Sequence, residues 1–142
     1  MRGALILAVG KLKEPCLEQS CEDYYRRCRR TLPISVKEVR DLAALRSALP
    51  ERATLVILDE RGGQVGSRDF ATRLGRWLET PRPLVFVVGG ADGLDDELRA
   101  RADFLLSLGK MTFAHRLVRL MLAEQLYRAV SILEGSPYHR EG

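Results

Sequence analysis

Cysteine and histidine are scarce in this sequence, with three cysteines and two histidines among 142 residues. Cys16, Cys21 and Cys28 are spaced too irregularly for a zinc site, so we expect buried, reduced cysteines and no metal. Two histidines cannot form a metal site without further ligands. The ordinary interpretation of both His115 and His139 is a surface histidine, although the polar, aromatic segment around His139 argues against it there.

Long hydrophobic runs are also missing. The N-terminal run 4–9 is far shorter than the roughly 20 apolar residues that span a bilayer. It is also too short for a signal peptide. We therefore expect a soluble, cytoplasmic protein with no membrane partner. The length suits one domain, residues 1–142, since domains commonly hold about 100–200 residues.

Neither basic nor acidic residues are in large excess in this sequence. Lysine and arginine number 23 against 19 acidic residues, a net charge of +4. The excess lies toward both ends of the chain, and the middle is slightly acidic. This permits a polyanionic partner without establishing one. Four arginines, Arg26, Arg27, Arg29 and Arg30, cluster in the first third of the chain, as either a contact with such a partner or a solvated face.

The apolar residues that are present recur in two alternating patterns. Short continuous runs predict buried strands, and spacings of three or four predict helices. The predicted strands are 4–9, 34–39, 55–58, 84–88 and 104–108. The predicted helical faces are Leu17, Cys21, Tyr24, Cys28 and Leu32; Leu42, Leu45 and Leu49; and Phe70, Leu74 and Leu78, with further helices over 95–102 and 114–133. This alternation is typical of an α/β fold with a mostly parallel sheet.

Glycines and a capping residue mark two of the connections. Gly62, Gly63 and Gly66 predict a loop before the third helix, and Ser67 is placed to cap that helix. The last helix is apolar around most of its circumference, which indicates burial on more than one side. We expect a homodimer formed through this helix.

Ligands of parallel sheets bind beyond the carboxyl ends of the strands, here the loops after Leu58, Val88 and Leu108. The glycine-rich segment 89–93 follows a strand but matches neither the dinucleotide fingerprint nor a P-loop. The segment is either a tight turn or a binding site in which the glycine backbone approaches a ligand closely. The residues alone therefore indicate a small α/β protein with a ligand at its glycine loops and a possible RNA partner.

Several ordered motifs carry a more specific signal. They are the segments 8–11, 58–62, 86–94, 106–115, 124–129 and 137–140. In order, spacing and chain length this series resembles the ribosomal RNA large subunit methyltransferase H family, a branch of the SPOUT methyltransferases. The resemblance spans nearly the whole chain.

The resemblance implies a SPOUT-type α/β knot, with a mostly parallel sheet and a C-terminal trefoil knot. It implies S-adenosylmethionine as methyl donor and requires no metal. The positions that match the family's cofactor site are Leu58, Gly89, Leu108, Gly109, Lys110, Met111, Thr112 and Phe113. The family often has serine where Gly109 stands, a change that still permits backbone contacts.

The implied activity is methyl transfer to N3 of a pseudouridine in 23S ribosomal RNA on the assembled ribosome. The hypothesis for His139 is proton handling or base contact, because a free imidazole titrates near pH 6.5. Tyr138 is expected to stack on the base, and Arg128 and Arg140 to hold phosphate or orient the base. The tail is expected to complete the site of a neighbouring subunit.

Three alternatives stay open on the sequence. The first is a non-catalytic ribosome-binding or assembly factor, which would need no ligand at the glycine loops. The second is a SPOUT methyltransferase that acts on another RNA position. The third is a nucleotide- or flavin-binding α/β module, which the missing phosphate motifs disfavour.

Overall fold

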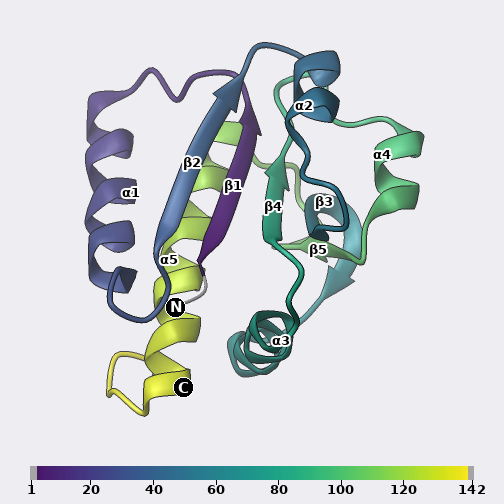
Figure 1. Ribbon diagram of the computed structural model, residues 1–142. Coiled ribbons are helices and arrows are strands. Elements are labelled where there is room, and N and C mark those ends of the chain that lie inside the picture. The colour runs from purple at the N-terminus through teal and green to yellow at the C-terminus, as the bar shows by residue number, and fades with distance from the viewer. Residues whose placement is uncertain (1–2, 141–142) are drawn as a thin grey trace.

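A five-stranded parallel sheet forms the centre of the computed structural model, which describes residues 3–140 (Figure 1). Its strands are β1 (Ala4–Val9), β2 (Ile34–Val39), β3 (Thr54–Gln64), β4 (Leu84–Val88) and β5 (Phe104–Ser107). Their order in the sheet is β2-β1-β4-β3-β5, and every neighbouring pair is parallel. The predicted α/β class with a parallel sheet is therefore confirmed, while the trefoil knot stays a prediction.

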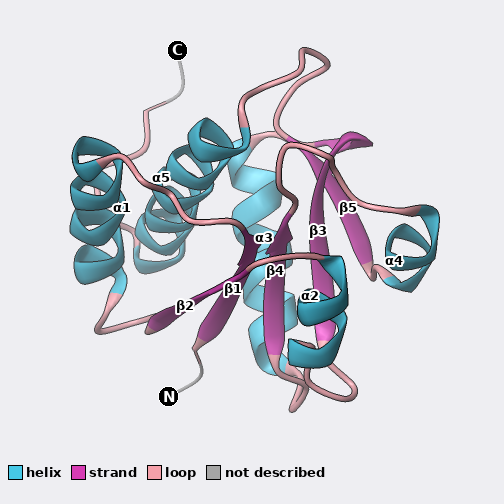
Figure 2. Ribbon diagram, turned by 90° about the horizontal axis from the view of Figure 1, so that it is seen from above, coloured by secondary structure: helices cyan, strands magenta, loops and turns pink. Residues whose placement is uncertain are grey.

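Helices cover both faces of this sheet (Figure 2). One face carries α1 (Pro15–Cys28), α3 (Ser67–Glu79) and α5 (His115–Glu134), and the other carries α2 (Leu42–Ala48) and α4 (Asp96–Arg101). The predicted domain, 1–142, also includes residues 1–2 and 141–142, which lie outside the described part. That the chain is a single domain stays a prediction.

Each face of the sheet has its own hydrophobic core, and β4 shows why. Leu84, Phe86 and Val88 pack with α1, α3 and α5, whereas Val85 and Val87 pack with α2 and α4. Successive strand side chains point to opposite faces, so a strand in the middle of a three-layer fold is apolar throughout. All five residues of β4 are buried, as the continuous run predicts.

Tyr24 packs against the same core as Cys21 and Cys28, half-buried beside Tyr127, so its place on the apolar face of α1 is confirmed. Tyr25, which the predicted face does not include, is buried there as well.

The predicted cap of α3 is wrong. Ser67 makes no capping hydrogen bond to that helix. Its hydroxyl instead donates to Gln125 of α5 at 2.8 Å, so a neighbouring helix decides the surroundings of this side chain.

The predicted glycine loop is also wrong in part, because β3 continues through it. Leu58 and Gly63 both pair with Leu106 of β5, so residues 59–62 form a bulge within the strand. A Cβ at Gly62 would lie 2.5 Å from the Leu105 carbonyl oxygen. Glycine at this position lets the two backbones approach closely and keeps β3 paired beyond the bulge.

The last helix extends close to its predicted bounds, and α1 and α3 of the same chain pack along it. Much of its apolar circumference is therefore covered within the chain. Leu117 and Leu133 remain exposed on it, at 43% and 46% of their full surface.

The expectation that all three cysteines are buried is wrong for Cys16, which is exposed at the start of α1. No helix among residues 3–140 is long and apolar enough to cross a membrane.

Candidate functional site

A cavity of about 550 Å³ lies beside the bulge of β3 and the carboxyl ends of β4 and β5. The three strands are neighbours in the sheet and parallel, so these points meet at one edge. The bulge and the loops that follow β4 and β5 form the wall, together with the first turn of α5. The size is ordinary for a small-molecule site. The three segments chosen from the sequence by the strand-end rule therefore line one cavity.

Seven of the eight predicted cofactor positions line this cavity. They are Leu58, Gly89, Leu108, Gly109, Met111, Thr112 and Phe113. Lys110, the eighth, is exposed and absent from the lining. The remaining lining includes Asp59, Glu60, Asp92, Arg99 and His115.

The glycine-rich loop after β4 is a tight turn and also a wall of the cavity. The Gly93 backbone N–H donates to the Gly90 carbonyl at 3.0 Å, and Gly93 has φ +74°, which only glycine adopts at little cost. At Gly89 an added Cβ would lie 3.0 Å from Cγ of Leu94. The two interpretations left open by the sequence are therefore compatible.

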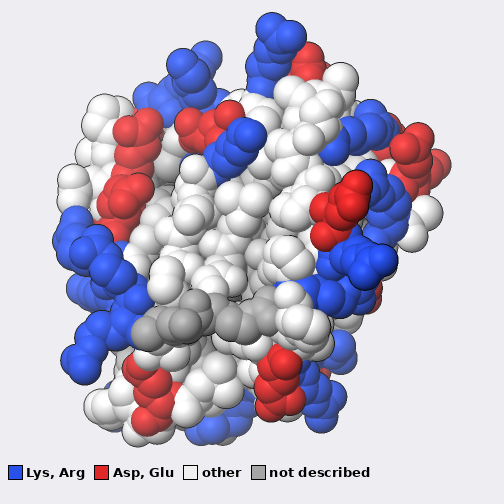
Figure 3. All heavy atoms as spheres, in the orientation of Figure 1, with Lys and Arg blue, Asp and Glu red and all other residues white. Residues whose placement is uncertain are grey.

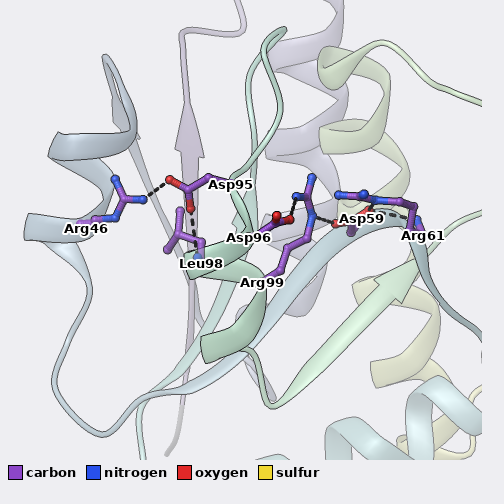
Figure 4. A network of polar contacts seen from close by, with 7 residues as sticks. All are labelled: Arg46, Asp59, Arg61, Asp95, Asp96, Leu98 and Arg99. Carbon is purple, nitrogen blue, oxygen red and sulfur yellow. Dashed lines mark hydrogen bonds and ion pairs between the residues drawn. The ribbon is translucent and has the colours of Figure 1, made fainter.

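The bulge in β3 places Asp59 at the cavity, where Arg99 of α4 contacts it (Figure 4). The Asp59 side chain is only 6% exposed and that of Arg99 is 23% exposed. The Arg61 backbone N–H donates to the same carboxylate at 2.9 Å. Burial acts to raise the pKa of the Asp59 carboxyl, but these hydrogen bonds and the nearby arginines outweigh it and hold that pKa below its usual range.

The start of α4 is held from its other side (Figure 4). Asp95 accepts a hydrogen bond from the Leu98 backbone N–H at 3.0 Å and thereby caps the helix. Its second carboxylate oxygen accepts from Arg46 of α2. Since α4 directly follows the loop 89–93, contacts with α2 and β3 together fix one wall of the cavity.

A hydrogen bond ties the loop after β5 to the bulge of β3. The Thr112 hydroxyl donates to the Glu60 carboxylate at 2.6 Å across the exposed rim. Among the described residues that line the cavity, three carry carboxylates, Asp59, Glu60 and Asp92, and Arg99 carries a guanidinium. Such a lining favours a ligand with positive charge. Among the described residues, no three His, Cys, Asp or Glu side chains gather as metal ligands would.

The residues predicted to act on the substrate form a second cluster, at the far end of α5. The Tyr138 hydroxyl donates to Glu124 at 2.8 Å, and Arg128 donates to the same carboxylate at 2.6 Å. Nη1 of Arg128 lies 3.1 Å from Nδ1 of His139. The structure thus brings together three of the four predicted residues, while Arg140 is exposed beside them.

The two clusters are separate within one chain. On α5, the cavity lining ends at Val118, and Arg128 lies ten residues further along. At 1.5 Å per residue, that is about 15 Å along the helix axis. None of the described residues of the C-terminal tail, 135–140, lines the 550 Å³ cavity.

Four residues of these clusters were not proposed as site residues from the sequence. Asp59 and Glu60 lie in a segment that the strand-end rule selects, so their position was a usable signal. Arg99 gave none, because its partner is 40 residues away in the chain. Glu124 opens one of the recognised motifs, but its role depends on the folded tail.

Comparisons with known proteins agree with one another. A family model described as "Predicted SPOUT methyltransferase" matches residues 3–139. Ribosomal RNA large subunit methyltransferase H from Ruegeria pomeroyi is 50% identical over 95% of this chain and 97% of its own length. The protein of the same name from Laribacter hongkongensis is 42% identical over 96% of this chain and 97% of its own length.

Two solved structures resemble the fold at low sequence identity. A "probable methylase family protein" from Haemophilus influenzae superposes with a TM-score of 0.60 at 10% identity, covering 99% of this chain and 71% of that one. The SpoU methyltransferase AviRb from Streptomyces viridochromogenes, solved in complex with AdoMet, gives a TM-score of 0.50 at 12% identity. That match covers 95% of this chain and 59% of the other.

Proposed function

Since the chain belongs to the SPOUT methyltransferase family, we propose that it transfers a methyl group from S-adenosylmethionine to N3 of a pseudouridine in 23S ribosomal RNA. The observation that carries this proposal is the near full-length identity to relatives named for methylation of the large-subunit ribosomal RNA. The cavity and the tail cluster supply two sets of residues that such a reaction needs.

The cavity fits the methyl donor in size and in charge. Apolar side chains from Leu58, Leu108 and Phe113 would surround the adenosine portion, and Gly89 and Gly109 leave space for the ligand beside the backbone. The acidic side of the lining suits the positive sulfonium. When bound, S-adenosylmethionine supplies an activated methyl group, so the protein's task is to hold donor and base in line.

The tail cluster would hold the base. Tyr138 presents a ring for stacking, and Arg128 and Arg140 can contact phosphate or a carbonyl oxygen of the base. Burial first, and then the hydrogen bond to Glu124, raise the pKa of Tyr138, so its phenol stays protonated at neutral pH. Tyr138 therefore acts as a donor and not as the group that removes the N3 proton.

The separation of the two clusters supports a homodimer with a shared site. Within one chain the tail contacts α5 at Glu124 and Arg128, six and ten residues beyond Val118, the last residue of α5 in the cavity lining. A partner chain packed along α5 would bring its own tail to the cavity and would cover Leu117 and Leu133. The tail would then act in trans.

A ribosomal substrate, encountered in the cytoplasm, suits the distribution of charge. Cationic side chains gather over the C-terminal end of α1, at the lower left of Figure 3. Four arginines there, Arg26, Arg27, Arg29 and Arg30, are exposed. We propose that this face contacts phosphate groups of the ribosomal RNA. Ribosome binding that depends only weakly on salt concentration would contradict this contact.

The test of the activity uses purified protein, S-adenosylmethionine and ribosomes from a strain that lacks its own enzyme. Mass spectrometry of the digested 23S ribosomal RNA should show one added methyl group on a pseudouridine. The same reaction with free 23S ribosomal RNA serves as the control for the requirement for assembled ribosomes. Ribosome binding without any methylated product would favour the non-catalytic assembly factor, and a methyl group elsewhere would favour a different RNA position.

The shared site is tested by co-expressing two differently tagged chains, one with Gly109→Val at the cavity and one with His139→Ala in the tail. Either variant alone should be inactive. A site formed in trans leaves the mixed dimer with one intact pair of clusters, so we expect about half of the wild-type activity. An inactive mixed dimer would place both clusters of a site on one chain. A single 16 kDa species in light scattering at micromolar protein would refute the dimer itself.

A further inference from the structure

The C-terminal tail, residues 135–140, is folded back against α5 by its own backbone (Figure 1). Gly135 has φ +74° and ψ 20°, the left-handed conformation that favours glycine. The Ser136 backbone N–H donates to the Ser131 carbonyl at 2.9 Å, and that of Gly135 donates to Ile132 at 3.1 Å. These two bonds form a Schellman motif, which ends the helix and reverses the chain.

Glu124 is the point on α5 to which this tail is attached. Its carboxylate, 20% exposed, accepts from the Tyr138 hydroxyl at 2.8 Å and from Nη2 and Nε of Arg128 at 2.6 and 3.1 Å. It also accepts from Gln125 at 3.0 Å, and Gln125 accepts from Ser67 of α3. The guanidinium of Arg128 lies 4.8 Å from the centre of the Tyr138 ring. One carboxylate therefore holds both a helical arginine and a tail tyrosine.

Arg128 determines which nitrogen of His139 carries the hydrogen. A guanidinium has donors but no acceptor. With Nη1 at 3.1 Å, Nδ1 of His139 must be the acceptor, and the neutral ring then carries its hydrogen on Nε2. The hydrogen bond to Glu124 is the largest cause that raises the pKa of Arg128, which keeps this side chain a donor throughout the neutral range.

We infer that Glu124 is a positioning residue for methyl transfer, and that His139 takes part as an Nε2–H hydrogen-bond donor rather than as a proton acceptor. The inference rests on the proposed function of the tail. It differs from the initial hypothesis of proton handling by His139, because the ring's lone pair already faces Arg128.

The chemistry of the base fits a donor. N3 of pseudouridine lies between two carbonyl groups, and the charge left when its proton departs spreads over both oxygens. An N–H directed at one of them stabilises that charge as it develops. In the step, the bond between the methyl carbon and sulfur breaks, the bond between that carbon and N3 forms, and the N3 proton passes to water.

The protonation of the ring is measured directly by long-range ¹H–¹⁵N correlation NMR on the full-length protein labelled at histidine. The wild-type His139 should show the Nε2–H tautomer at neutral pH. Glu124→Ala and Arg128→Met should both shift it toward a mixture of tautomers. The matched control is Glu134→Gln, a glutamate on the same helix that contacts Thr31 instead of the tail, and it should leave the tautomer unchanged. A wild-type ring with its hydrogen on Nδ1, or doubly protonated, would overturn the inference.

Kinetics on ribosomes separate a donor from a base. Glutamine at position 139 can place an amide N–H where Nε2–H lies, so His139→Gln should keep measurable activity while His139→Ala loses it. Glu124→Ala should lower kcat about 10- to 100-fold through loss of positioning, with an unchanged Kd for S-adenosylmethionine in calorimetry. Equal inactivity of the glutamine and alanine variants at position 139 would overturn the donor role. An unchanged kcat in Glu124→Ala would overturn the positioning role.

Failure of the proposed function is distinguishable from failure of this inference. Absence of any methylated product with the wild-type protein would refute the activity. The tautomer of His139 in wild type and in Glu124→Ala would still decide whether Glu124 and Arg128 set the state of the ring.

Discussion

Replacing Arg99 by methionine should destabilise the protein by removing the closest cationic partner of the buried Asp59. Methionine keeps the length and apolar stem of the side chain but removes the guanidinium. The Asp59 carboxylate, 6% exposed, would keep the Arg61 backbone N–H at 2.9 Å and the more distant, exposed Arg61 guanidinium at 3.7 Å. Breaking a fully buried pair from one side costs about 3–5 kcal/mol. The Arg99 side chain is 23% exposed, so water reaches this ion pair and lowers the cost. We therefore expect Arg99→Met to lower the free energy of unfolding by about 2–3 kcal/mol at pH 7.

The pH dependence of this loss has a defined sign. In the wild type the pKa of Asp59 is lowered, so its contribution is present above its unfolded value, about 3.9, and is lost as pH falls through the lower folded pKa. In Arg99→Met the hydrogen bond and the charge of Arg99 no longer lower the pKa of Asp59, so that pKa rises from its wild-type value. The variant therefore lacks part of the stabilisation that the wild type has at neutral pH, and its difference from the wild type shrinks as pH falls below about 3.9. The double variant Asp59→Asn with Arg99→Met should recover part of the loss.

Urea unfolding at fixed protein concentration, at pH 7 and pH 3, measures both effects. The matched control is Arg101→Met, the exposed arginine two positions further along α4, which should change the free energy of unfolding by less than about 0.5 kcal/mol. An Arg99→Met protein as stable as this control at pH 7 would refute the reasoning about the buried pair.

Three further outcomes follow from the cavity and from α1. Thr112→Val removes the hydrogen bond to Glu60 and should weaken S-adenosylmethionine binding about fivefold in calorimetry, the equivalent of about 1 kcal/mol. Thr112→Ser keeps the hydroxyl and should bind as the wild type does. Equal affinities of the valine and serine variants would show that this bond does not order the loop. Gly109→Val should abolish S-adenosylmethionine binding, because the side chain would enter the cavity. The protein should stay folded by circular dichroism, because a Cβ at this position meets only the Phe113 ring, at 3.4 Å. An affinity equal to that of the wild type would remove Gly109 from the site. A thiol reagent should label Cys16 rapidly and spare Cys28, whose pKa burial raises to about 12; more than one fast thiol per chain by mass spectrometry would contradict this.

The architecture and the cofactor cavity were predictable because their signals are local. The run 84–88 gives β4 with the same bounds, since five consecutive apolar residues suit a strand covered on both faces. The strand-end rule then selects the three loops that surround the cavity, since parallel neighbours end at the same edge. The resemblance adds individual positions to those loops, and seven of the eight line the cavity.

Two of the errors share one cause, which is a partner distant in the sequence. Ser67 is well placed to cap α3, but Gln125, 58 residues away, takes its hydroxyl. The glycines at 62 and 63 suggest a loop on their own, and only the close backbone of β5 turns them into a strand.

The sequence by itself therefore determined the α/β class, the parallel strands, the three ligand loops and the family to which the chain belongs. Only the tertiary structure decided that Arg99 pairs with Asp59, that Glu124 holds the tail, and that the tail lies away from the cavity within one chain. The physical reason is that periodicity and turn chemistry act over a few residues. Ion pairs and cluster positions depend instead on the strand order of the sheet and on the chain reversal at Gly135.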